Sequence, residues 1–156
     1  MMSTPDLLTN RIYACLYARQ DGGHDWALLS TGSTSTKSGV LYRATNDGGG
    51  SWRFECRDER VTRSRNVRLL VIIGRCGVLA PPLRALVVRP LETPARDGQE
   101  RFTARVWMRR AIRMLDDAGV IQCSNIRALE DELDTFIDSC SSCAGAYRVL
   151  VSSCSA

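Results

Sequence analysis

The sequence predicts an α+β fold in which an antiparallel-rich sheet of about five strands packs against two C-terminal helices. Alternation of apolar and polar residues, typical of strands, fills the first half of the chain, and helical periodicity begins only after residue 101. The composition, 44% hydrophobic and 24% charged, is that of a globular protein. The 156 residues predict a single domain, 1–156, with a loose leader at 1–10 and a tail at 140–156 after the last helix.

The predicted strands follow one another from residue 11 to residue 73. Residues 11–19 alternate cleanly, which predicts a strand with one buried face formed by Ile12, Ala14, Leu16 and Ala18. Glycine-rich or Ser/Thr-rich turns then separate further strands at 24–30, 39–45 and 51–57. The apolar, β-branched run Val67–Ile73 predicts a central strand that is covered on both faces.

Two amphipathic helices are expected after a polar loop. The first spans 102–118, with Thr103 as N-cap and Gly119 as C-cap. Winding it at 100° per residue gathers its apolar side chains, Ala104 and Trp107 among them, on one face that we expect to pack on the sheet. The second helix spans 125–139 and has an acidic outer face. The arginines of the first helix are therefore expected in solvent or near the acidic helix: Arg105, Arg109 and Arg113.

The charge pattern does not favour a nucleic-acid binder. Twenty-one basic and seventeen acidic residues give a net charge of +4, whereas such domains usually show a pI above about 9 and a clustered basic footprint. The arginine-rich segment 53–75 is more typical of a solvated strand face than of a binding surface. Nucleic acid is therefore an unlikely partner, although an acidic partner on this surface is kept as an alternative.

Targeting and membrane signals are not visible in the sequence. No apolar run approaches the ~20 residues that span a bilayer, so no membrane span is expected. The N-terminus lacks a basic start followed by an apolar stretch. We therefore expect a cytoplasmic protein.

The seven cysteines predict neither a disulfide framework nor a metal site. Their number is odd and they are scattered along the chain. Cys140 and Cys143 have the CxxC spacing of zinc and redox motifs, but a zinc site needs four ligands and the chain has one histidine, His24. A redox CxxC would open a helix, whereas this one follows a helix. The sequence therefore predicts no metal and no cofactor.

His24 is a candidate general base. It begins a predicted strand directly after a Gly-Gly turn, which exposes it, and Trp26 lies on the same face, where its ring can orient and shield an imidazole. A general base requires a nucleophile within reach. The alternative is a structural histidine.

Two short motifs resemble a known group of proteins. His24-Asp-Trp-Ala-Leu28 and Ala104-Arg-Val-Trp107 are similar to the HWAL-type strand and the CRxW or NCxxW helix start of uncharacterised fungal proteins. The similarity covers about 11–121 and includes segments 39–44, 52–55, 69–74 and 107–121. A histidine strand followed by a cysteine helix also resembles the permuted papain-like enzymes, the NlpC/P60 and lecithin:retinol acyltransferase group.

The resemblance implies a cysteine-nucleophile acyl-transfer enzyme of papain-like fold in which Ala104 occupies the nucleophile position. A thiol there would feel the positive end of the helix dipole, with His24 as its base and backbone N–H groups to hold an oxyanion. Alanine at this position indicates an engineered inactive enzyme or a natural pseudoenzyme. The implied reaction is hydrolysis of an amide, ester or thioester, or transfer to an amine, including small-molecule biosynthesis.

Further site residues are expected around this pair. Asn46 or Asp47, at the end of the third predicted strand, are candidates to orient the imidazole. A small-molecule or peptide substrate is expected to contact Trp26, Tyr42, Thr103, Arg105 and Trp107.

Two other hypotheses stay open. One is a non-catalytic binding module that keeps the groove between the first strands and the helix but does no chemistry, and whose arginine-rich segment 53–75 contacts an acidic partner or nucleic acid. The other is a small α+β protein in which His24 is structural, and in which Ala104 and Trp107 are plain core residues. A separation of more than about 8 Å between His24 and Ala104, without a cleft between them, would favour the second.

Overall fold

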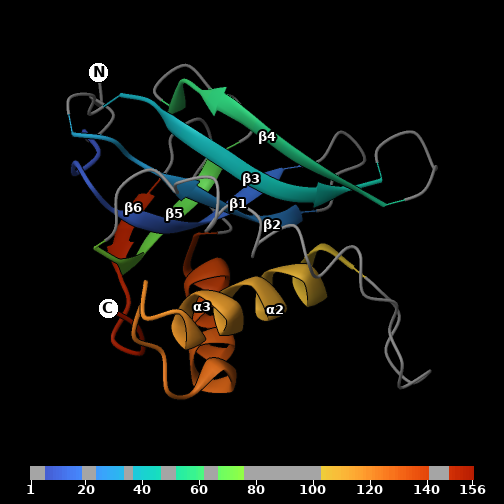
Figure 1. The fold of residues 1–156 in the computed structure, drawn as a ribbon, viewed down its shortest axis with the longest axis vertical. Helices are drawn as coiled ribbons and strands as arrows, with labels where there is room; N and C mark the ends of the chain where they lie inside the picture. Colours follow the sequence, from blue (N-terminus) through green and yellow to red (C-terminus); the bar gives the residue numbers. More distant parts are fainter. Residues whose placement is uncertain are drawn as a thin grey trace.

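The computed structural model describes residues 6–18, 24–33, 37–46, 52–61, 67–75, 103–140 and 148–156. These residues form a six-stranded sheet in the order β4-β3-β2-β1-β5-β6, with two helices on one face (Figure 1). The elements are β1 (Ile12–Ala18), β2 (His24–Ser30), β3 (Gly39–Thr45), β4 (Arg53–Glu59), β5 (Val67–Gly74), α2 (Ala104–Asp117), α3 (Ile126–Cys140) and β6 (Arg148–Val151). The α+β class predicted from the sequence is therefore confirmed.

The sheet is mixed, with one strand more than the sequence predicts. Neighbouring strands from β4 to β5 pair antiparallel, and β6 pairs parallel to β5. Strand β6 lies within the segment 140–156, which the sequence pattern predicts to be a tail. Its four residues, Arg-Val-Leu-Val, are too few to show a period, so pairing with β5 defines the strand. Strand β5 lies between β1 and β6, next to the edge, while β2 and β1 form the middle of the sheet.

The helix-facing side of the sheet carries the larger core. Directly paired residues such as Leu16 and Trp26, or Leu28 and Tyr42, present their side chains to α2 and α3. Trp107 of α2 is fully buried in this core, with its ring 6.3 Å from that of Phe54. The apolar stripe predicted for the helix thus packs on the sheet as expected.

The opposite side of the sheet is also buried, which corrects the prediction that β1 has one buried face. Tyr13 and Cys15 are inaccessible to solvent and belong to a second apolar cluster that includes Leu7 and Val61. Tyrosine and cysteine are frequent interior residues, so their alternation with aliphatic residues does not by itself indicate an exposed face.

Capping residues define where both helices begin. The Thr103 hydroxyl accepts a hydrogen bond from the Val106 N–H at 3.2 Å, so α2 begins at residue 104. Gly119 follows its C-cap with a left-handed φ of 76°, in agreement with the predicted stop. The Asn125 side chain caps α3 in the same way through the Ala128 N–H. Neither of these helices is long and apolar enough to cross a membrane.

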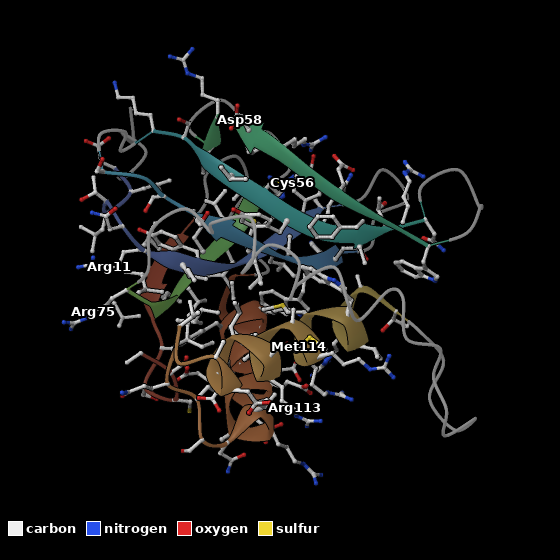
Figure 2. The ribbon with its side chains drawn as sticks, viewed as in Figure 1. Arg11, Cys56, Asp58, Arg75, Arg113 and Met114 are labelled. Atoms are coloured by element: carbon white, nitrogen blue, oxygen red, sulfur yellow. The ribbon has the colours of Figure 1, made fainter. Side chains whose placement is uncertain are left out.

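Ion pairs connect the two helices. Arg105 lies 2.8 Å from the Asp134 carboxylate, and Arg109 forms a two-point contact with Glu130. Two arginines of α2 therefore lie near the acidic helix, which is one of the two positions expected for them. Arg113 is exposed and lies on the side of α2 away from the sheet, whereas Cys56 and Asp58 lie on the edge strand β4 (Figure 2).

Candidate active site

A pocket of about 360 Å³ lies where one end of the sheet meets the start of α2. In Figure 1, α2 begins beneath the end of the sheet at which β3 ends and β4 begins. Four elements, β1, β2, α2 and α3, and three flanking positions contribute to its wall: Leu16, His24, Asp25, Trp26, Asn46, Trp52, Thr103, Ala104, Arg105, Asp134 and Ile137. His24 and Ala104, which are separated by about eighty residues in the sequence, therefore face the same cavity.

Strand register brings the polar residues of the sheet to one end. Ala18 of β1 pairs with His24 at the first position of β2. Tyr42 of β3 pairs with Leu28 of β2, and Asn46 directly follows the end of β3. Thr45 pairs with Arg53, and Trp52 directly precedes β4. His24, Asn46 and Trp52 all line the pocket at this end of the sheet.

The start of α2 closes the pocket from the other side. Ala104 is the first residue of the helix and is 3% exposed. The Thr103 hydroxyl and carbonyl accept hydrogen bonds from Val106 and Trp107. Among the described residues, the N–H groups of Ala104 and Arg105 meet no acceptor. These two dipoles are therefore oriented like the donors that stabilise a developing negative charge at a helix start.

Two of the charged side chains at the pocket, Arg105 and Asp134, pair with each other. Arg105 donates to Asp134 at 2.8 Å and lies 3.6 Å from Glu130, and the side chains of Arg105 and Asp134 are 44% and 45% exposed. This pair lies at the rim, where α2 and α3 face each other. His24, which also lines the pocket, is exposed.

Some predicted site residues do not reach the pocket. Tyr42 is fully buried, its hydroxyl is 3.2 Å from Ser30 Oγ, and its ring stacks on Phe54. Trp107, one helical turn after Ala104, points into the core between helix and sheet. The prediction that these two contact a substrate is not supported by their positions, because side chains on the pocket-facing strands are accessible only near the end of the sheet. Asp47 lies outside the described residues.

Other lining residues were not predictable from local patterns. Trp52 precedes β4, and Asp134 and Ile137 belong to α3. The sequence shows the amphipathic pattern of α3, but which part of the helix reaches the pocket depends on packing between distant segments.

None of the described cysteines lines this pocket, and two of them have thiols with a raised pKa. Burial, and then the charge of Glu59, raises the pKa of the Cys15 thiol far above its ordinary value, with a smaller opposite effect of Arg43. A more open hollow of about 520 Å³ between the α2–α3 loop and the C-terminal residues contains Cys123 and Cys154. Burial also raises the pKa of Cys123, and Asp116 adds to this effect. No histidine lines that hollow.

The described part of the chain holds no candidate metal site, and some of its basic side chains are paired. Within it, no group of three His, Cys, Asp or Glu side chains could hold a metal ion. The CxxC motif extends outside the described residues at Cys143. In the arginine-rich segment, Arg57 forms ion pairs with Glu55 and Glu59, and Arg43 of β3 also pairs with Glu55. Part of the positive charge near β4 is therefore neutralised locally.

Comparison of the chain with protein-family models, curated proteins and solved structures found no match. Functional inference therefore depends on the chemistry of the pocket.

Proposed function

We propose that this pocket is the site of a cysteine-nucleophile acyl-transfer enzyme and that Ala104 occupies the position of the nucleophile. The observation that carries the proposal is the convergence of His24, Asn46 and Ala104 on one pocket. The resemblance of the two motifs to a histidine strand and a cysteine helix start supports the same assignment. The proposal accounts for a histidine and the first turn of a helix that line the same pocket.

The proposed chemistry follows from the groups at the pocket. With a thiol at position 104, His24 takes the thiol proton and the thiolate attacks the carbonyl carbon of an amide, ester or thioester. The N–H groups of Ala104 and Arg105 stabilise the oxyanion. His24 then returns the proton to the leaving group, and water or an amine releases the acyl group. Asn46, which lines the same pocket as His24, is proposed to orient the imidazole.

Alanine leaves the binding part of this site without its nucleophile. A methyl group cannot form the acyl bond, so the chain as it stands is proposed to bind a carbonyl compound without turnover. This makes a non-catalytic ligand-binding protein the second candidate function. The salt dependence of binding separates a small-molecule ligand from a nucleic acid. Contacts to several phosphates make the logarithm of the binding constant fall steeply with the logarithm of the salt concentration, whereas binding of an uncharged ligand gives a flat slope.

The test restores the nucleophile. We expect Ala104→Cys to form an acyl adduct with p-nitrophenyl esters, because the introduced thiol would lie at the helix start and face His24. Intact-mass spectrometry measures the adduct and peptide mapping locates it. Arg113→Cys is the matched control, since it places a thiol on the exposed side of the same helix.

The expected result is an adduct at position 104 that forms at least tenfold faster than at position 113. His24→Ala, combined with Ala104→Cys, should remove most of this difference. Equal rates at the two positions, or a rate that does not depend on His24, would contradict the proposed function.

A further inference from the structure

Large apolar side chains form part of the pocket wall. Four of the eleven lining residues are two tryptophans and two aliphatic residues, Trp26, Trp52, Leu16 and Ile137, beside polar residues that include the buried Asp25. Leu16 and Trp26 are a directly paired couple on β1 and β2, and Ile137 faces them from α3. We propose that the pocket takes an uncharged carbonyl compound with an aromatic or similarly flat apolar group, an inference that rests on the proposed function.

The position of the two indoles favours a flat group. Trp26 is 6% exposed and belongs to the same core cluster as Met108, Ile112 and Leu133 of the two helices. Trp52 is half-buried and directly precedes β4. Aromatic walls attract aromatic ligands through stacked or edge-to-face contacts beyond the effect of buried area alone. The space between sheet and helix start is therefore suited to a ring.

The ion pairs at the rim disfavour a charged ligand. Arg105 already contacts Asp134 at 2.8 Å and lies near Glu130. A carboxylate ligand would have to compete with these two side chains for the guanidinium, and an ammonium ligand would have to compete with Arg105 for Asp134. A neutral ligand enters without breaking an ion pair, and its carbonyl meets the N–H groups at the start of α2.

The size of the pocket limits the ligand. At about 360 Å³ it lies at the lower end of the range for small-molecule sites, roughly 300–1,000 Å³. This favours one ring with a short carbonyl-bearing arm, such as an arylacetyl group, over a peptide of several residues.

The unsubstituted chain permits a direct binding test, because Ala104 prevents turnover. Three matched probes separate ring, charge and shape: phenylacetamide, phenylacetate and 2-cyclohexylacetamide. We expect phenylacetamide to bind at least tenfold more tightly than phenylacetate and three- to tenfold more tightly than 2-cyclohexylacetamide. In spectra of the ¹⁵N-labelled chain, the indole N–H signals of Trp26 and Trp52 should shift, and that of the buried Trp107 should stay.

The variant Trp52→Leu tests the ring contact while retaining an apolar side chain. It should remove the preference for phenylacetamide over 2-cyclohexylacetamide, whereas Leu8→Ala, at an exposed apolar residue, should retain it. Equal affinity for all three probes, no binding of any probe, or a shift of Trp107 alone would overturn the inference.

Failure of the proposed ligand class can be told apart from failure of the proposed function. Selective binding of phenylacetamide, without acylation of Ala104→Cys by phenylacetyl esters, would uphold the ligand class and reject the acyl-transfer chemistry. Acylation of Ala104→Cys by acetyl and phenylacetyl esters at equal rates, without selective binding, would reject the ligand class alone.

Discussion

At the scale of single residues, Trp107 fixes the position of α2 on the sheet. Its side chain has no accessible surface and contacts Phe54 in the main core. Ala104 is one turn earlier on the same helix face, so the orientation of Trp107 determines that Ala104 faces the sheet and the pocket. Trp107, a core residue, thereby positions Ala104 at the pocket although Trp107 takes no part in the proposed chemistry.

Removal of this ring should cost much of the stability of the protein. We expect Trp107→Ala to lower the free energy of unfolding by about 3–5 kcal/mol, the usual cost of emptying a large aromatic site. Arg113→Ala, at an exposed position of α2, should change it by less than about 0.5 kcal/mol. Urea denaturation followed by circular dichroism measures both. Similar small effects of the two substitutions would mean that the helix is rotated relative to our description.

At the scale of elements, the C-terminal residues are held to α3 by one carboxylate. Glu132 accepts hydrogen bonds from the hydroxyls of Ser152 and Ser153 and from the Ser153 N–H, the last at 2.9 Å. Burial acts to raise the pKa of Glu132, but the serine hydrogen bonds outweigh it and lower this pKa below its ordinary value. Strand β6, which precedes these serines, is thereby linked to α3 as well as to β5.

This link predicts a pH-dependent contribution to stability. Because the pKa of Glu132 is lower in the folded than in the unfolded chain, the contribution is present above the unfolded pKa of about 4.3 and is lost as the pH falls through the folded pKa. We expect Glu132→Gln to destabilise the protein by about 1–2 kcal/mol at pH 7, and by much less near pH 3, where the carboxyl is protonated. Urea unfolding at both pH values measures the difference. A constant difference would indicate that the charge of Glu132 is not involved.

Local periodicity predicts most of the elements but not their partners. The alternation of residues 11–19 and the helical stripe around Trp107 depend on neighbours in sequence, and the structure contains both elements as predicted. Strand β6 depends on pairing with β5, which lies about eighty residues earlier, and no local pattern reveals it. The buried face of Tyr13 and Cys15 similarly depends on Leu7 and Val61.

The sequence indicated two residues of the candidate site. His24 was indicated by its position after a glycine turn and Ala104 by the resemblance of its motif to a cysteine helix start, and both line the pocket. Asp134 and Ile137 are ordinary members of an amphipathic helix, and only the docking of α3 brings them to the site. Tyr42 and Trp107 have side chains of a type that often contacts ligands, but hydrophobic burial places both in the core.

At the scale of the whole molecule, the topology explains why the pocket forms. Parallel pairing of β5 and β6 requires a crossover connection, and the chain between these strands includes α2 and α3. Both helices therefore lie on one face of the sheet (Figure 1). The first residues of α2 then lie over the end of the sheet where β2 begins and β3 ends, and this places Ala104 and His24 in one pocket.

The central claim is that position 104, the helix start and His24 form one chemical site, and the pKa of a thiol introduced by Ala104→Cys tests it most directly. Burial alone would raise this pKa above its ordinary value of about 8.5, whereas the helix dipole and an imidazolium ion pair would lower it. The pH dependence of the iodoacetamide reaction, followed by peptide mapping, gives the value. We predict a pKa below 7.5 that rises by at least one unit when His24→Ala is added. An ordinary or raised pKa that does not respond to His24→Ala would contradict the claim.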